Sequence, residues 1–409
     1  MGNIFRINAG ILNPVSQQKC SFTRDGTLLF NDDGLILYCG PRKHAPLVPS
    51  KKILVQPGAF IIPGMIDCHT HLSQYYVRGR SGDTLLGWLK NHIFPAERKF
   101  KDPKHAARVS RKFYQRLLSN GITCAALYTN YQAGVEAAFD EGRKAGIRAV
   151  IGYTLMDRNV PDALKQEPSK ALDECRELFD KHHQKKGRLY FSVNPRFAPS
   201  CTPVFMKALG DLAKQKEIYV QTHISENLQE LAAVKKLFPK ASSYAEVYDR
   251  AGLLTPRTLL AHGIHLSRSE RLLIQKRGCG MVHCPSSNLF LHSGRFPVEH
   301  WRNYGKLSLG SDVGAGPSFS MFDVMRDAYY LNIMPLSRLF YLATLGGAGT
   351  LGLENTIGSL KAGKQADFSV IRLSDIQDPG SEELLYDLIF KWDQREVVQV
   401  FVGGQRVWP

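Results

Sequence analysis

Two histidines separated by one residue, His69 and His71, stand at the end of an apolar run in this sequence of 409 residues. In a β-strand, residues two apart point to the same side, so the two imidazoles would aim at one point. Neutral imidazole is a common zinc ligand, and two imidazoles supply half of a four-coordinate site. A pair that merely faces solvent has the same spacing, so the other polar residues must decide between the two interpretations.

Further reactive residues stand where other apolar runs end. His223 and Glu226 follow one run, His262 closes a second, and Asp312 closes a third. Each of them alone could be a core histidine with a satisfied hydrogen bond, or an aspartate that caps a helix. Their joint occurrence at the ends of several runs favours a metal site with three nitrogen ligands and one carboxylate ligand. The predicted ligands are His69, His71, His223 and Asp312.

This ligand set implies a hydrolytic chemistry. A divalent ion held by three nitrogens and one carboxylate keeps room for a water and can lower its pKa to about 7. Asp312 can take the proton of that water, and Glu226, three residues past a ligand, can carry a proton to a substrate without binding the ion. His262 can orient the attacking oxygen or polarise the substrate. The predicted catalytic residues are Glu226, His262 and Asp312.

The elements that must position these residues alternate between strand-like apolar runs and segments with helical periodicity. Eight strands alternating with helices is the count for a (β/α)8 barrel, whose active site lies at the carboxyl ends of its strands. A doubly wound sheet is the alternative, but no Gly-X-Gly-X-X-Gly turn follows any of the runs. The predicted strands are Ala59–Asp67, Ile122–Thr129, Arg148–Leu155, Leu189–Asn194, Ile218–His223, Thr258–His262, Met281–Cys284 and Leu307–Asp312; the predicted helices include Val135–Ala145, Lys170–Lys186, Pro203–Lys216 and Leu228–Phe238.

The two ends of the chain have a different character. Near the N-terminus, the pattern over 27–40 is strand, turn, strand, and near the C-terminus 397–407 reads as a hairpin with a Gly-Gly turn. We expect both ends to form one small β-sandwich with the barrel inserted between them. The predicted domains are a composite sandwich of residues 1–60 and 358–409 and a metal-dependent hydrolase barrel of residues 61–357.

The end of the fourth predicted strand bears on the number of metal ions. A two-ion site would often place a lysine there, whereas this chain has Asn194, Pro195 and Arg196. We therefore expect one ion per chain.

The composition and the N-terminus bound the class of protein. Apolar residues make up 44% of the chain, enough for a large core, and no apolar run reaches the roughly 18 residues of a membrane span. The first residues lack the charged-then-apolar pattern of a secretion signal. The eight cysteines include no Cys-X-X-Cys pair and are expected to be free thiols. These features predict a cytoplasmic protein without a membrane partner.

The net charge of +16 raises the alternative of a nucleic-acid-binding protein. The largest basic cluster, residues 181–188, stands where a helix is predicted to end, and basic residues there suit the helix dipole. No aromatic and basic recognition motif accompanies the charge, so we expect no nucleic-acid partner. The alternative predicts binding of mixed-sequence DNA or RNA that weakens steeply with salt.

A run of motifs gives the sequence a family resemblance. Pro63–His71, followed by His223, His262 and Asp312 and by Gly363–Asp367, resembles the signature of the amidohydrolase superfamily over nearly the whole chain. More particular stretches resemble the guanine deaminase branch. The resemblance implies an α/β protein with a distorted (β/α)8 TIM barrel and a small β-sandwich from both termini, a zinc ion (with iron also open) and a homodimer. The particular stretches are 71–75, 86–89, 94–97, 196–202, 222–227, 283–289 and 310–316.

The resemblance also implies a reaction, the hydrolysis of the amidine C–N bond of guanine to xanthine and ammonia. Gln74 has both a donor and an acceptor for a ring edge, and Arg196 can donate to the O6 carbonyl. Phe197 or Trp88 can supply a stacking surface. The alternatives are a solvent-facing loop residue for Gln74 and a surface ion pair for Arg196. The implied substrate-binding residues are Gln74, Trp88, Arg196, Phe197, His223 and Glu226, and segment 75–94 is the predicted closing loop.

Other functions remain open on sequence alone. The nearest is deamination of another heterocycle at the same metal site: 8-oxoguanine, a pterin, a triazine or an adenosine derivative. A non-catalytic scaffold on an inherited barrel would be expected to have lost metal ligands, and here all are present. The deaminases with a Pro-Cys-X-X-Cys motif are excluded, because this chain lacks that motif.

Overall fold

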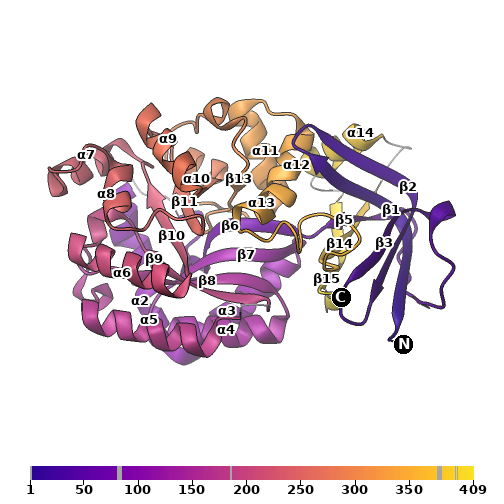
Figure 1. Ribbon diagram of the computed structural model, residues 1–409, viewed down its shortest axis with the longest axis horizontal. Helices are drawn as coiled ribbons and strands as arrows, with labels where there is room; N and C mark the ends of the chain where they lie inside the picture. Colours follow the sequence, from indigo (N-terminus) through magenta and orange to yellow (C-terminus); the bar gives the residue numbers. More distant parts are fainter. Residues whose placement is uncertain (1, 81–84, 185–186, 375–379, 392, 394) are drawn as a thin grey trace.

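The computed structural model describes the whole chain except residues 1, 81–84, 185–186, 375–379, 392 and 394. Its centre is a sheet of eight strands, each parallel to the next, which run in chain order around a barrel (Figure 1). The strands are almost wholly buried, as expected of parallel strands covered on both faces. They are β6 (Met65–His71), β7 (Ile122–Thr129), β8 (Arg148–Leu155), β9 (Leu189–Pro195), β10 (Tyr219–Ile224), β11 (Thr258–His262), β12 (Gly280–His283) and β13 (Leu307–Leu309).

The segment that follows β13 closes the barrel against β6. The Asp312 amide donates to the carbonyl of His69 at 2.8 Å, and the His71 amide donates to the carbonyl of Val313 at 2.7 Å. The first and last strands therefore meet at the residues in which the sequence predicts metal ligands.

Several barrel helices begin at conventional side-chain caps. Thr202 accepts from the Phe205 amide at the start of α6, and Asn227 forms a capping box with Glu230 at the start of α7. The predicted helix Pro203–Lys216 is confirmed. The helices are α1 (Leu85–Trp88), α2 (Phe94–Arg98), α3 (Pro103–Leu118), α4 (Gln132–Ala145), α5 (Pro168–His182), α6 (Pro203–Lys216), α7 (Leu228–Leu237), α8 (Tyr244–Arg250), α9 (Arg268–Arg277), α10 (Pro285–Phe290), α11 (Met321–Asn332), α12 (Leu336–Leu342), α13 (Leu345–Thr350) and α14 (Ser381–Phe390).

Short helical turns fill several connections. The turn η2 (Leu72–Gln74) directly follows β6 and carries Gln74. The others are η1 (Arg42–His44), the π-helical η3 (Leu89–Ile93), η4 (Lys99–Lys101), η5 (Asp162–Leu164), η6 (Ala198–Ser200) and η7 (Val298–Trp301).

A second sheet joins the two ends of the chain beside the barrel (Figure 1). Its order is β16-β15-β14-β5-β1-β2-β3, with β4 paired to β1. Antiparallel pairing of β14 with β5 brings C-terminal residues beside N-terminal ones, for example Phe368 beside Pro63. The fold class predicted from the sequence is confirmed, while the division into domains stays a prediction. The strands are β1 (Ile4–Ser16), β2 (Lys19–Asn31), β3 (Ile36–Pro41), β4 (Lys51–Lys52), β5 (Ala59–Pro63), β14 (Phe368–Leu373), β15 (Arg395–Val402) and β16 (Gln405–Trp408).

The single predicted strand Ala59–Asp67 is wrong, because the chain changes sheets at Gly64. β5 pairs with the terminal sheet, and β6 then starts the barrel. The Gly64 amide donates to the carbonyl of Asp367 at 3.0 Å. A Cβ at this position would lie 2.1 Å from the Thr123 hydroxyl oxygen, so only glycine fits the crossing.

Candidate metal centre and substrate cavity

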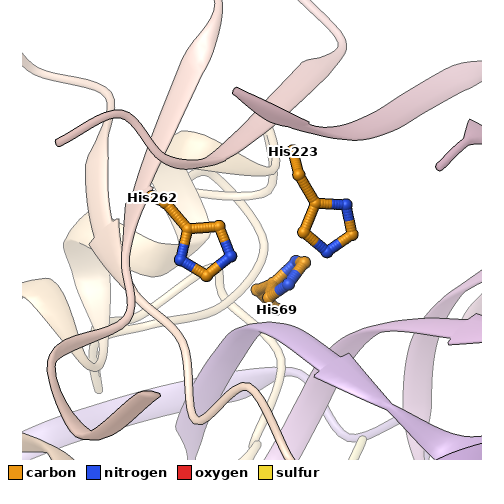
Figure 2. A group of neighbouring side chains, drawn as sticks. All are labelled: His69, His223 and His262. Atoms are coloured by element: carbon orange, nitrogen blue, oxygen red, sulfur yellow. The ribbon is translucent and has the colours of Figure 1, made fainter. Parts of the chain in front are cut away.

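His69 and His71 lie on the same side of β6, as their spacing predicts. Their Nε2 atoms are 3.3 Å apart, and Nε2 of His223, from the end of β10, lies 3.3 Å from Nε2 of His71. Figure 2 shows the rings of His69, His223 and His262 converging from their separate strands. Three strand ends thus direct imidazole nitrogens at one region.

Asp312 completes this group from the segment that closes the barrel. One carboxylate oxygen, Oδ1, lies 3.3 Å from Nε2 of His69 and 3.1 Å from Nε2 of His71. The residue has a left-handed backbone (φ +47°), which is uncommon for a non-glycine residue although aspartate tolerates it better than most.

The ionisation states at this cluster suit a cation. Burial lowers the pKa of His69 to about 4 and that of His223 well below its usual value, so both rings are neutral near pH 7. Burial also disfavours the charged form of Asp312, but the adjacent His69 and His71 outweigh it and hold its pKa well below the usual range. Potential ligand atoms lie within 4.8 Å of one another in two overlapping groups, His69 with His223 and His262, and His69 with His71 and Asp312. Imidazole nitrogens and a carboxylate placed in this way form a donor set that fits a divalent metal ion.

The tautomer of His223 is set by a backbone carbonyl that directly follows β9. Its Nδ1–H donates to the carbonyl of Arg196 at 2.6 Å. Nε2 therefore keeps its lone pair and points it at the cluster. A hydrogen bond of this kind on the far side of the ring orients a metal-binding histidine and raises its basicity.

His262 ends β11 and is fully buried, with a left-handed backbone (φ +71°). Its Nδ1–H donates to the side-chain oxygen of Asn288 at 3.0 Å. Its Nε2 has no hydrogen-bond partner among the described residues, and it lies 3.7 Å from Glu226 and 3.8 Å from Asp312. A buried nitrogen aimed between two carboxylates is suited to hold a polar ligand atom there.

Glu226 lies beyond β10 and is buried. Burial raises the pKa of its carboxyl to about 7, the nearby His262 opposing this shift and Asp312 adding to it. The Glu226 amide donates to Glu230 at 2.8 Å, and the Ser293 hydroxyl donates to Oε1 of Glu226 at 3.4 Å. A carboxyl poised between its two ionisation states near neutral pH is suited to transfer protons.

A cavity lined by polar and aromatic side chains opens beside this cluster. It brings together every predicted site residue except His69, which belongs to the adjoining cluster. The structure therefore assembles the predicted residues, while their individual roles stay predictions. The lining residues are His71, Gln74, Trp88, Leu89, Arg196, Phe197, His223, Glu226, His262, Leu291 and Asp312.

The residues predicted to contact a base are buried rather than exposed. Gln74 is 1% exposed and Arg196 is 4% exposed, so neither a solvent-facing loop residue nor a surface ion pair describes them. The indole N–H of Trp88 donates to the carbonyl of Arg80 at 2.7 Å, which fixes the ring at the cavity wall. Of the predicted closing loop, residues 81–84 lie outside the described residues.

Sequence reasoning missed several residues of this region. Glu97 contacts both Gln74 and Arg196, Asn288 holds His262, and Ser293 contacts Glu226. Asn130 directly follows β7, where a polar side chain after a buried run was a usable signal. Glu97 and Asn288 lie within stretches that carry the family resemblance, but nothing in their local pattern states what they contact.

Within the described part of the chain, every helix is too short or too polar to cross a bilayer.

Comparisons with known proteins agree with this geometry. Residues 60–407 match the amidohydrolase family. The chain is similar to the guanine deaminase of Escherichia coli (strain K12), at 34% identity over 427 residues that cover 100% of this chain and 97% of the relative.

Two solved structures are similar in fold. A guanine deaminase from C. acetobutylicum with bound guanine in the active site superposes with a TM-score of 0.91 at 32% identity, covering 99% of this chain and 100% of that chain. An adenosine deaminase from Xanthomonas campestris with bound zinc superposes with a TM-score of 0.87 at 25% identity, covering 98% of this chain and 92% of that chain.

Proposed function

The chain belongs to the amidohydrolase family, and from this premise we propose that it is a hydrolase that converts guanine and water to xanthine and ammonia. The observation that carries the proposal is the cavity that joins the histidine and aspartate cluster to Gln74 and Arg196. The similar enzyme solved with bound guanine supports the same substrate.

We propose that His69, His71, His223 and Asp312 hold one zinc ion per chain. The neutral imidazoles of His69 and His223 and the carboxylate of Asp312 support this ligand set, and the similar adenosine deaminase was solved with zinc. A bound divalent ion supplies Lewis acidity that makes water a nucleophile near neutral pH. Iron remains the alternative metal.

In the proposed mechanism, protons move through two carboxylates. Asp312 accepts a proton from the water that attacks C2 of guanine, and His262 orients that oxygen through Nε2. Glu226 protonates the ring atom N3, so that the purine ring takes up the electron pair. Asp312 then delivers the proton it took from water to the amine, and ammonia leaves as the new hydroxyl gives its proton to Glu226 and becomes the C2 carbonyl. Supporting distances are those from Nε2 of His262 to Glu226 (3.7 Å) and to Asp312 (3.8 Å).

The base is proposed to lie between polar and aromatic walls of the cavity. Arg196 donates to the O6 carbonyl, and Gln74 bonds the ring edge. Phe197 and Trp88 provide stacking surfaces, and His223 and Glu226 complete the binding surface. All six residues line the cavity.

Several finer properties are proposals as well. We propose a homodimer, a cytoplasmic location, and domains of residues 1–60 with 358–409 and of residues 61–357. Activity on another aminated heterocycle, such as 8-oxoguanine, a pterin, a triazine or an adenosine derivative, is the alternative function at the same site.

The test is ammonia release from guanine by purified protein of measured metal content, with adenine, cytosine and 8-oxoguanine in parallel. Fast release from guanine, with about one metal ion per chain, is the expected result. If metal-loaded protein released no ammonia from guanine, guanine would not be the substrate, and the proposed base contacts of Gln74 and Arg196 would be in doubt.

A further inference from the structure

A buried carboxylate, Glu97, connects the two side chains that are proposed to read the base. Glu97 is 1% exposed and lies on α2, outside the barrel strands. Its Oε1 accepts from Nε2 of Gln74 at 3.0 Å, and Arg196 donates from Nη1 to both of its oxygens, at 2.7 and 2.8 Å. Asn130 donates to Oε2 at 3.3 Å.

The donors to Glu97 come from three different strand ends. Gln74 follows β6, Asn130 follows β7, and Arg196 follows β9. Asn130 is held in turn, because the hydroxyl of Ser73 donates to its side-chain oxygen at 2.8 Å. One acceptor thus fixes the relative positions of side chains that no local segment could hold together.

Glu97 also decides which way the Gln74 amide faces. Its carboxylate requires a donor, so Nε2 of Gln74 must point at it. The Gln74 oxygen then lies 3.3 Å from the Gly314 amide, which donates to it. The amide is therefore held in one of its two orientations from both sides.

Arg196 is oriented by the same helix. Among the described residues, its side-chain hydrogen bonds run from Nη1 to Glu97. Its guanidinium carbon lies 5.6 Å from the ring centre of Phe94, also on α2. Arginine has five N–H donors, so others remain for a ligand in the cavity that Arg196 lines. The carboxylate also neutralises a guanidinium that is buried and would otherwise lack a counter-charge.

We propose that Glu97 is a positioning residue that sets the selectivity of the site for a purine with a carbonyl at C6. By holding Arg196 and Gln74 in place, it presents N–H donors of the guanidinium to an acceptor on the base, and a purine without that carbonyl loses this bond. The proposal rests on the proposed deamination of guanine and names a residue on which its specificity depends.

The test compares guanine with 2-aminopurine, which has the same amine at C2 but no carbonyl at C6. For the metal-loaded wild-type protein and Glu97→Gln, kcat/KM is measured on both bases, and 2-aminopurine is also titrated as a competitive inhibitor of guanine turnover. The expected result is that Glu97→Gln reduces the preference for guanine by about 10-fold to 100-fold, the range for a hydrogen bond from a charged donor. The expected decrease in kcat/KM is mainly in the value for guanine.

Two further variants keep the test decisive if Glu97→Gln folds poorly. Glu97→Asp retains the charge and should retain more of the preference than Glu97→Gln. In an Arg196→Met background the preference is already lost, and adding Glu97→Gln should change it by about twofold or less, because both changes act on one interaction.

The matched control is Glu141→Gln. Glu141 is also a buried glutamate with basic partners, Arg111 and Lys144, but it lies on α4 and does not line the cavity. Its loss should leave the preference unchanged. Equal losses on both bases in Glu97→Gln and Glu97→Asp would overturn the proposal by showing a purely structural role. Absence of guanine turnover in the wild-type protein would instead contradict the proposed function itself.

Discussion

Two carboxyl groups near the same histidine have opposite ionisation behaviour. The pKa of Asp312 is held well below its usual range, whereas burial raises the pKa of Glu226 to about 7. A pair of acids separated in this way can divide the work of base and acid between them. Their surroundings, rather than their chemical type, therefore support the proposed roles of Asp312 as the proton acceptor and Glu226 as the proton donor.

Glu226→Gln should leave the metal content unchanged and reduce kcat on guanine by about 10²–10⁴-fold, the usual loss when a general acid or base is removed. The glutamine has nearly the same shape but cannot exchange a proton. Steady-state kinetics and elemental analysis on the same sample measure the two quantities. A near-normal rate would remove Glu226 from proton transfer.

The pH dependence should show a group with a pKa of about 7. Glu226 must be protonated to donate to N3, so kcat/KM on guanine is expected to fall as the pH rises above about 7. The residual activity of Glu226→Gln should lack this decline. A profile that stays flat through this range in the wild-type protein would contradict the assignment.

The same shift has a consequence for stability. Folding raises the pKa of Glu226 from 4.5 to about 7, so the folded chain holds a proton that the unfolded chain releases. The contribution of this proton on Glu226 to the free energy of unfolding is fully present below about pH 4.5 and is lost as the pH rises through about 7.

At the scale of elements, the site depends on how closely the ends of the barrel strands approach. Gly310 follows β13, and its amide donates to the carbonyl of His283 at 3.0 Å. A Cβ at Gly310 would lie 2.7 Å from Cβ of His69. The absence of a side chain at Gly310 therefore leaves room for His69, a proposed metal ligand, where β6 meets the segment after β13.

Gly310→Ala should push His69 out of place and weaken metal binding by about 10-fold to 100-fold, as for other changes beside metal ligands. Competition with a chelator of known affinity measures the effect. Gly305→Ala is the control, because a Cβ there meets no atom within 4 Å. An unchanged metal affinity in Gly310→Ala would show that β6 can shift to make room for the added methyl group without moving the imidazole of His69.

The elements also show where sequence reasoning succeeds. The bounds of β7, β8 and β11 agree with the predicted strands, since each is a buried apolar run between clear breaks. β1 (Ile4–Ser16) escaped prediction because it is only partly buried and lacks an alternating pattern. The change of sheet at Gly64 was not predicted either, because the residues before and after that glycine in the sequence are buried and apolar.

The candidate site was predictable to a similar extent, for a physical reason. His69, His71, His223 and His262 stand at strand ends, and Asp312 follows β13 by three residues, so their position in the chain carries the signal. Glu97 lies on a helix, and its contacts come from the ends of three strands. Only the tertiary fold brings such partners together, so the sequence pattern around Glu97 does not predict them.

At the scale of the whole molecule, a buried ion pair joins the barrel to the terminal sheet. Nε of Arg148, on β8, lies 3.1 Å from Oδ2 of Asp367, just before β14. The same carboxylate accepts from the Gly403 amide at 2.7 Å. Both side chains are almost fully buried, so each needs the other as a counter-charge.

Asp367→Ala should lower the free energy of unfolding by about 3–5 kcal/mol, because it leaves the Arg148 charge buried and unpaired. Arg148→Met combined with Asp367→Ala should recover part of the loss. Denaturant unfolding measures both, and kcat on guanine should be unchanged in the folded protein, since the pair does not line the cavity. A loss below about 1 kcal/mol, typical of an exposed pair, would contradict this account.

The seam of the barrel gives the metal centre a second significance. Its proposed ligands stand on both sides of the seam: His69 and His71 on β6, and Asp312 in the segment after β13. Besides its part in chemistry, an ion bound by all three would be a cross-link between the first and last strands. Such a link closes a loop that contains nearly the whole barrel, and closing a long loop restricts the unfolded chain more than closing a short one. Loss of the ion would then remove a structural tie as well as a catalyst.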